Sequence, residues 1–216
     1  MSKITDKEKN ELLEIIDNAG LYRLKSMEEF SVYLDKCMDG FENNALFTYL
    51  CGGTFRKDIV KQIFYSSYCA ASGNAITYAD SEELNSCAVW IPSGILQTNL
   101  TEFFKSGESA LLKMGGFPLI TRVLSYEISV KGMKNSLTNH NEWYLYNYEC
   151  TPDYDNNEVF TRMVKPVVSY AWKTGRACYI ECSVESRIDA LMKMGFHIVD
   201  TITIPKTDIK LYGMMV

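Results

Sequence analysis

The segment from Trp143 to Trp172 is the part of the chain whose residue types and order point most directly to chemistry. Its first residues alternate tyrosines with other side chains, which is typical of a β-strand, and a helical pattern begins near Glu158, after Pro152. The first N–H groups of a helix lack acceptors within the helix, and the helix dipole adds partial positive charge there. A helix that begins just after a strand is therefore a ready site for a phosphate group.

Other familiar chemistries find little support in the sequence. The chain has no Gly-x-Ser-x-Gly motif, no phosphate-binding P-loop and no dinucleotide fingerprint. Its two histidines, His140 and His197, lie far apart, which argues against a histidine-rich metal site and gives no pointer to a catalytic triad. The seven cysteines are odd in number and form no Cys-x-x-Cys pair, so we expect free thiols rather than a disulfide framework or a zinc site.

Length and composition further limit the class of protein. The chain has 216 residues, a formal charge of −5 and 47% hydrophobic residues, which suits one globular domain or two small ones. The acidic balance argues against a general nucleic-acid binder, because phosphate contacts need a basic surface. The first sixteen residues hold no apolar signal segment, and charged residues at 113, 122 and 127 interrupt the apolar stretch 111–130. We therefore expect a cytoplasmic protein with no membrane or nucleic-acid partner.

The hydrophobic periodicity predicts a mixed α/β sheet. The first third is mainly helical, and Ser26 with Glu29 resembles a capping box that opens a helix through Asp35. Helical spacing also covers 56–68 and 100–134, the latter interrupted by glycines at 115 and 116 and a proline at 118. The expected strands are an antiparallel pair at 75–78 and 87–91, then 143–150, 178–182 and a final hairpin of 196–204 with 209–215, with helices at 158–172 and 185–194 between them.

Several of these segments, taken in order, resemble the GNAT superfamily of acetyl-CoA-dependent N-acetyltransferases. The matching residues are Trp143-Tyr144-Leu145, Pro152-Asp153-Tyr154, Pro166, Ala171, Gly175, Tyr179-Ile180-Glu181-Cys182-Ser183 and Met194-Gly195-Phe196. Val89-Trp90-Ile91-Pro92-Ser93-Gly94 is also similar to a strand end of one subgroup. The resemblance covers about 26–216. It implies a single GNAT-fold α/β domain over 1–216, with a helix-rich half at 1–135 that carries a β-hairpin and an acetyl-CoA-binding half at 140–216.

The resemblance also implies where acetyl-CoA would bind. In the family it enters where two parallel strands splay apart, and its pyrophosphate lies on a loop written Arg/Gln-x-x-Gly-x-Gly/Ala. By spacing from Pro152, that loop is 155–160, with Asp155 in the Arg/Gln position and Glu158 and Phe160 in the glycine positions. The residues implied to bind acetyl-CoA are Tyr148, Cys150, Asp155, Asn156, Asn157, Glu158, Val159, Phe160 and Ser183.

This loop departs from the family pattern in a way that opposes an anion. Asp155 and Glu158 are three residues apart and could cap the helix themselves, so that the helix occupies its own anion site. Each carboxylate would also repel a pyrophosphate by about 3 kcal/mol at about 5 Å and an effective dielectric near 20, or under about 1 kcal/mol where water screens it. We therefore expect weakened binding of acetyl-CoA.

The implied catalytic residues are Glu149 and Glu181, each near the end of a strand. A buried carboxylate there would have a raised pKa and could take a proton from an amine. The tyrosine that protonates the leaving thiolate in many family members is replaced by Leu191, which leaves Tyr148 and Tyr179 as substitute acids.

We therefore expect direct acetyl transfer to a small amine, with the acetyl carbonyl polarised by backbone N–H groups near Cys150. The alternative is a GNAT-fold protein that has lost catalysis and binds another ligand or a protein partner. An unrelated α/β fold would be indicated if the strands around Tyr146 and Tyr179 were not adjacent and parallel. The last hairpin could pair with a second copy in a homodimer, but no residue requires it.

Overall fold

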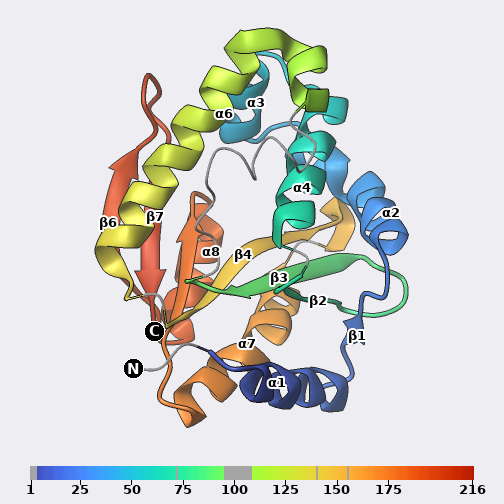
Figure 1. Ribbon diagram of the computed structural model, residues 1–216, viewed down its shortest axis with the longest axis vertical. Coiled ribbons are helices and arrows are strands. Elements are labelled where there is room, and N and C mark those ends of the chain that lie inside the picture. Colours follow the sequence, from blue (N-terminus) through green and yellow to red (C-terminus); the bar gives the residue numbers. More distant parts are fainter. Residues whose placement is uncertain (1–3, 72, 95–108, 140, 155) are drawn as a thin grey trace.

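A mixed β-sheet runs through the middle of the computed structural model, which describes residues 4–71, 73–94, 109–139, 141–154 and 156–216 (Figure 1). The strands are β1 (Tyr22–Arg23), β2 (Ile76–Ala79), β3 (Ser86–Pro92), β4 (Trp143–Cys150), β5 (Cys178–Cys182), β6 (His197–Thr203) and β7 (Lys210–Met215). Among the described residues they form one sheet in the order β1-β2-β3-β4-β5-β7-β6. Only β4 and β5 pair in parallel there; the other neighbours are antiparallel.

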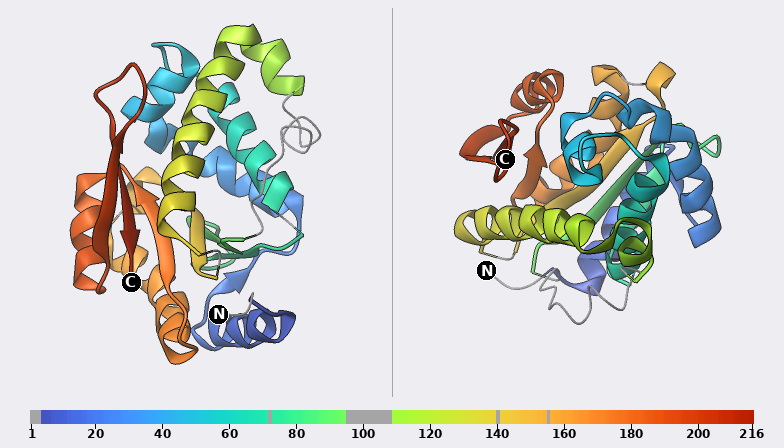
Figure 2. Two further views of the ribbon diagram at one scale, coloured as in Figure 1. Left: turned by 60° about the vertical axis from the view of Figure 1, so that its left-hand side comes forward. Right: turned by 90° about the horizontal axis from the view of Figure 1, so that it is seen from above.

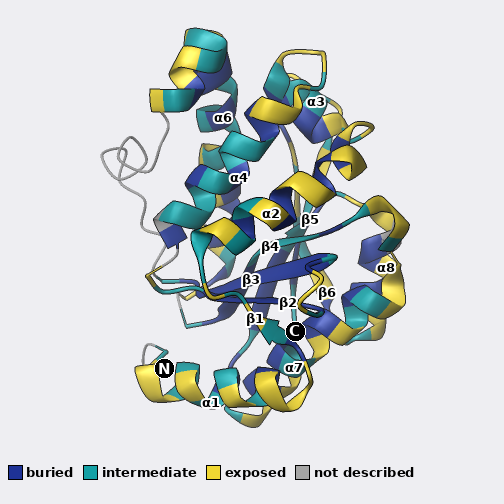
Figure 3. Cartoon of the chain, turned by 90° about the vertical axis from the view of Figure 1, so that its right-hand side faces the viewer, coloured by how far each residue is buried: buried dark blue, intermediate teal, exposed yellow. Residues whose placement is uncertain are grey.

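Helices cover both faces of this sheet (Figure 2). The helical elements are α1 (Asp6–Asn18), α2 (Met27–Cys37), η1 (Met38–Phe41), α3 (Ala45–Cys51), α4 (Lys57–Ala71), α6 (Ser109–Leu137), η3 (Pro152–Tyr154), α7 (Asn157–Lys173) and α8 (Glu185–Lys193). We call the face covered by α2, α3, α4 and α6 the upper face, and the face covered by α1, α7 and α8 the lower face, as they lie in Figure 1. Each face has its own apolar core, and the helices turn buried sides to the sheet and exposed sides to solvent (Figure 3).

The elements predicted from hydrophobic periodicity are confirmed to within a few residues. The Ser26 side chain accepts a hydrogen bond from the Glu29 N–H at 3.2 Å and begins α2 as expected, although Glu29 itself accepts from the Lys25 N–H. The glycine interruption in α6 is a backbone break at Gly116, whose φ of 64° and ψ of −166° are not helical. The expected start of that helix, near 100, lies outside the described residues. The short elements β1, η1 and α3 were not predicted, since each has too few residues to show a period.

A partly buried ion pair joins the N-terminal helix to the loop before β5. Arg176 donates from Nε and Nη2 to the two carboxylate oxygens of Glu8, both at 2.9 Å. Glu8 also accepts a 2.8 Å hydrogen bond from the Thr5 N–H at the start of α1. Burial alone would raise the pKa of Glu8, but the hydrogen bonds from Arg176 and Thr5 lower it below its ordinary 4.5.

We expect Arg176→Ala to lower the free energy of unfolding by about 2 kcal/mol, because it removes two charge-assisted hydrogen bonds and leaves the Glu8 carboxylate without its cationic partner. Since the Glu8 pKa is lowered, this stability is present above pH 4.5 and is lost as the pH falls through the lowered pKa. Urea unfolding of both proteins at several pH values measures it. Arg23→Ala, which breaks an exposed ion pair with Asp17, is the control and should cost less than about 1 kcal/mol. An equal loss in both variants would contradict the expectation.

Candidate functional site

The parallel strands β4 and β5 separate partway along their length. They pair from Trp143 with Cys178 to Leu145 with Ile180, and no pairing follows, although β4 continues to Cys150 beside β3. The backbone of β4 beyond Leu145 therefore has no strand partner on its β5 side in the described structure. This is the splay that the sequence predicted, and it excludes the unrelated fold, in which these strands would not be adjacent and parallel.

A β-bulge in β4 changes which side chains reach the splay. Val89 of β3 pairs with Asn147 and the next residue, Trp90, pairs with Leu145, so Tyr146 is an extra residue in β4. The predicted strict alternation of tyrosines along β4 is therefore wrong. Tyr146 packs with the upper core, whereas Tyr148 packs against the lower one.

The bulge has a consequence for the two candidate carboxylates. Glu149 pairs with Cys87, whose side chain belongs to the upper core. Glu181 lies next to Tyr144 and Tyr179, which also pack on the upper face. With unbroken alternation Glu149 would share the lower face with Leu145, so the extra residue in β4 places both carboxylates on the same face.

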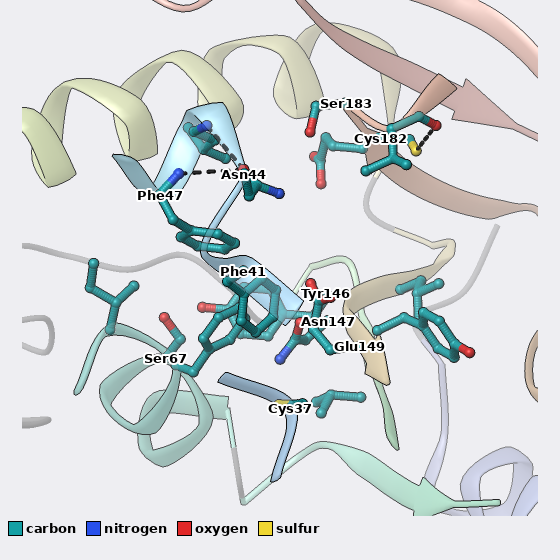
Figure 4. Close-up of a pocket in the computed structure, with 18 of the residues that line it drawn as sticks. Cys37, Phe41, Asn44, Phe47, Ser67, Tyr146, Asn147, Glu149, Cys182 and Ser183 are labelled. Carbon is teal, nitrogen blue, oxygen red and sulfur yellow. Dashed lines mark hydrogen bonds between the residues drawn. The ribbon is translucent and has the colours of Figure 1, made fainter. Parts of the chain in front are cut away.

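A cavity of about 540 Å³ occupies the splay and extends beneath the helices of the upper face (Figure 4). Glu149 and Glu181 both line it, as do Tyr148, Cys150, Phe160 and Ser183 from the implied cofactor residues. In Figure 4, Glu149 lies beside Tyr146 and Asn147 of β4, and Ser183 lies at the end of β5. Side chains from far apart in the sequence therefore share one cavity.

Glu181 has the clearest electrostatic signature of the cavity. Its Oε1 is closed off from solvent and has no hydrogen-bond partner among the described residues. Burial raises the pKa of Glu181 to about 7, although the nearby hydroxyl groups of Tyr144 and Tyr179 and the charge of Lys134 oppose the rise. The carboxyl group therefore changes protonation state in the neutral range, where a general base is most useful.

Helix α6 adds two residues that sequence reasoning missed, Tyr126 and Glu127, which both line the cavity. Burial, followed by the charges of Glu127 and Glu181, raises the pKa of Tyr126 well above its ordinary value. Tyr126 therefore keeps its proton at neutral pH and is a hydroxyl donor among the carboxylates. The sequence held no signal for it, because α6 is separated from β4 and β5 in the chain and only packing brings it to the splay.

Arg187, near the start of α8, is a third residue that the sequence analysis did not identify. Its guanidinium carbon lies 4.7 Å from the ring centroids of both Tyr148 and Phe160. Its Nη2 donates to Cys150 Sγ at 3.4 Å. The side chain is only 8% exposed and lines the cavity. Because Phe160 is in the first turns of α7, a positive charge stands beside the helix N-terminus that the sequence marked as an anion site.

The start of α7 differs from the expected capping box. Asn156 is the N-cap, and its side chain accepts a hydrogen bond from the Val159 N–H at 2.9 Å. A cap at 156 places Glu158 at the second helical position, one residue too early for a box, and Glu158 is exposed. The predicted self-capping by Asp155 and Glu158 is therefore wrong, and Asp155 lies outside the described residues. Of the remaining implied loop residues, Asn157 is exposed and Val159 is half-buried.

The two tyrosines proposed as substitute acids, Tyr148 and Tyr179, differ in whether they reach the cavity. Tyr148 reaches the cavity from the lower face, while Tyr179 is fully buried and does not line it. Burial raises the pKa of both phenols, so both keep their protons. Leu191 is fully buried in the lower core.

None of the seven cysteines takes part in a disulfide bond. No helix among the described residues is both long enough and apolar enough to cross a membrane.

Solved structures of acetyltransferases have a similar fold. An acetyltransferase from Corynebacterium glutamicum, described as histone acetyltransferase HPA2 and related acetyltransferase, aligns with a TM-score of 0.61 and 14% identity over 90% of this chain and 94% of that one. The polyamine N-acetyltransferase of Drosophila melanogaster, which forms N-acetylagmatine, aligns with a TM-score of 0.53 and 11% identity over 91% and 98%. No protein-family model and no curated protein matches the sequence. The chain has the fold of the GNAT acetyltransferases, as its sequence motifs predicted.

Proposed function

We propose that the protein is an acetyl-CoA-dependent N-acetyltransferase that transfers an acetyl group directly to a small amine. The observation that carries the proposal is the cavity in the β4–β5 splay, which holds Glu181 with its pKa raised to about 7. Solved neighbours of the same fold are acetyltransferases, one of which forms N-acetylagmatine.

Three features fit acetyl-CoA to this cavity. The β4 edge from Tyr146 to Cys150 offers backbone groups to the pantetheine arm, because β5 does not pair with it. The start of α7 offers N–H groups, of which Asn156 occupies that of Val159. Arg187 supplies the positive charge that the loop has lost, and the carboxylate of Glu158 is exposed, where water screens its repulsion.

The residues of the cavity supply the proton transfers. Acetyl-CoA would bring an acyl group on a thioester, whose C–S bond breaks as the amine C–N bond forms. Glu181 takes a proton from the ammonium group, so that the nitrogen lone pair becomes nucleophilic. We assign the Tyr126 hydroxyl, kept protonated by burial, as the donor of a proton to the departing thiolate; the second proton that the nitrogen loses as the amide forms then restores Tyr126. Glu149 provides a second negative charge near the amine.

Titration of acetyl-CoA by calorimetry, followed by a thiol-release assay with a panel of amines, tests the proposal. Micromolar binding together with turnover of at least one amine is the expected result. Binding without turnover would favour the alternative of a GNAT-fold protein that has lost catalysis. Failure to bind at millimolar acetyl-CoA would overturn the proposal.

Glu158→Gln should tighten acetyl-CoA binding by up to about fivefold, because it removes one exposed, screened charge beside the pyrophosphate site. The gain should shrink as salt increases. The matched control is Glu185→Gln, an exposed acid in the first turn of α8. A gain from Glu185→Gln as large as that from Glu158→Gln would show that net charge, rather than the loop, sets the affinity.

A further inference from the structure

One turn of α6 packs against the sheet at the position of Glu181 (Figure 1). Gly213 of β7 pairs with Glu181, so side chains at these two positions project to the same face of the sheet. A Cβ atom added at this glycine would lie 3.0 Å from Leu137 Cδ1, 3.1 Å from Met133 Sδ and 3.3 Å from the Tyr179 hydroxyl. The absence of a side chain at Gly213 therefore lets α6 approach the strand that carries Glu181.

Lys134 lies in this turn of α6 and is only 4% exposed. Its Nζ donates a 3.3 Å hydrogen bond to the Ser93 carbonyl oxygen and lies 5.0 Å from the centroid of the Tyr144 ring. Both of these groups are neutral, so the two contacts do not balance the ammonium charge. A buried ammonium group is costly unless a negative charge offsets it.

Carboxylates at longer range offset the charge of Lys134. Burial lowers the pKa of Lys134, and the charge of Glu181 gives the largest opposing effect, ahead of Glu127 and Glu142. Because the attraction between two charges is mutual, the ammonium group opposes the burial that raises the pKa of Glu181. Lys134 and Glu181 are therefore two buried, opposite charges that stabilise one another.

Hydrogen bonds at the end of β3 fix the group that holds Lys134. The Glu142 carboxylate accepts from the Ser93 hydroxyl at 2.7 Å and from two backbone N–H groups at 2.9 Å, those of Asn139 and Asn141. The Ser93 N–H donates to the Glu142 carbonyl oxygen at 2.9 Å. These bonds hold the Ser93 carbonyl in place, and with it the ammonium group that donates to it.

The other groups around Glu181 are neutral or acidic. The rings of Tyr144 and Tyr179 have centroids 5.5 Å apart, and both hydroxyl groups lie near the Glu181 carboxyl group. The titratable and charged groups around Glu181 and these two tyrosines in the described structure are Tyr126, Glu127 and Lys134 of α6, Tyr146 and Glu149 of β4, and Asp200 of β6. Lys134 is the cation of this set.

We propose that Lys134 is a positioning residue for acetyl transfer, whose buried ammonium group, held beside Tyr144 by the Ser93 carbonyl, favours the ionised form of Glu181. The proposal rests on the proposed function, which makes Glu181 the base. Lys134 is not part of the described cavity lining, so it acts through Glu181 rather than on the amine. A unit charge about 10 Å away shifts a pKa by about one unit at an effective dielectric near 20.

Lys134→Gln tests the proposal, because glutamine keeps an N–H donor for the Ser93 carbonyl and removes the charge. The thiol-release assay, with acetyl-CoA and the best amine of the panel, gives the pH profile of kcat/KM. Its midpoint should move from near pH 7 to about pH 8. At pH 6 kcat/KM should fall about tenfold, and at pH 9 less than about twofold. Lys134→Met, which also removes the donor, should shift the midpoint equally.

The control removes the same charge from the surface of the same helix. Lys131 lies one turn earlier in α6 and is exposed, so water screens it, and Lys131→Gln should shift the midpoint by less than about 0.3 pH units. A shift as large as that of Lys134→Gln would overturn the proposal, because the net charge of α6 would then set the midpoint. A loss of activity in both Lys134 variants that is equal at every pH would also overturn it, since that is the sign of a purely structural role.

Unfolding measurements test the charge coupling without turnover. The stability difference between Glu181 and Glu181→Gln is measured against pH, once in the wild type and once in Lys134→Gln. In the wild type, the advantage from the protonated Glu181 is lost as the pH rises through about 7; in Lys134→Gln this loss should occur about one pH unit higher. If this shift appears but no amine is acetylated, the coupling is supported and the proposed function is refuted. If amines are acetylated and neither midpoint moves, the role of Lys134 is refuted and the proposed function stands.

Discussion

Glu181→Gln is expected to lower kcat by about 10²- to 10⁴-fold, which is the usual contribution of a positioned general base. The amide occupies the same volume as the carboxylate but cannot take a proton from the bound ammonium group. Affinity for acetyl-CoA should stay within about threefold, because Glu181 is assigned to the amine rather than to the cofactor. Steady-state kinetics and calorimetry on the same preparation measure the two effects.

The pH profile gives a sharper result than the rate at one pH. Glu181 acts as a base only when it is ionised, and its pKa is raised to about 7. In the wild type, kcat/KM for the amine should therefore rise with pH, reach half its maximum near pH 7 and then level off, because this ratio reports the pKa of the free enzyme. Glu181→Gln should lose this rise. Glu149→Gln is the matched comparison and should keep the rise while increasing KM for the amine; the reverse pattern would make Glu149 the base.

The same substitution should stabilise the fold above neutral pH. Because the folded state holds the Glu181 proton more tightly than the unfolded chain does, this carboxyl group favours folding below pH 4.5, and that advantage is lost as the pH rises through about 7. Above pH 7 the buried charge costs up to about 3 kcal/mol, which the neutral amide avoids. A variant that is both slower and harder to unfold at pH 8 would distinguish a catalytic role from simple damage to the core.

The sequence predicted the order of elements well because each long element carries its own period. The bounds of β4 and β5 match the apolar runs 143–150 and 178–182, and proline or glycine ends several elements. The splay followed from the resemblance, because an ordered series of short motifs identifies a known topology. Such local signals are enough to position Glu149 and Glu181 near strand ends.

The sequence could not predict which side chains of β4 point to the upper face, or which helical residues line the cavity. The bulge at Tyr146 arises from pairing with β3, so no pattern within β4 reveals that Glu149 lies on the upper face. The cap of α7 falls on Asn156 although Asp155 is an equally good capping residue by type. Tyr126 and the cavity-lining phenylalanines Phe41, Phe47 and Phe64 lie on separate helical elements, and their contacts depend on long-range packing.

Arg187→Met is expected to weaken acetyl-CoA binding by about 10- to 100-fold, the range of a charge-assisted hydrogen bond to a phosphate group. Methionine keeps an apolar side chain against the edge-to-face pair of Tyr148 and Phe160, so the contact with both rings is kept while the charge is removed. Arg187→Lys keeps the charge and should lose less affinity. The salt dependence of acetyl-CoA binding should become shallower in Arg187→Met, because one fewer phosphate is neutralised by the protein.

A shortened ligand shows whether Arg187 acts on the phosphates. S-Acetylpantetheine carries the thioester and the pantetheine arm but no phosphate, so Arg187→Met should leave its affinity within about twofold. A parallel loss for both ligands would mean that Arg187 supports the wall of the splay rather than the anion. In that case the exposed start of α7, with Asn156 as its cap, would have to hold the pyrophosphate through backbone N–H groups alone, and Glu158→Gln would become the variant with the larger effect.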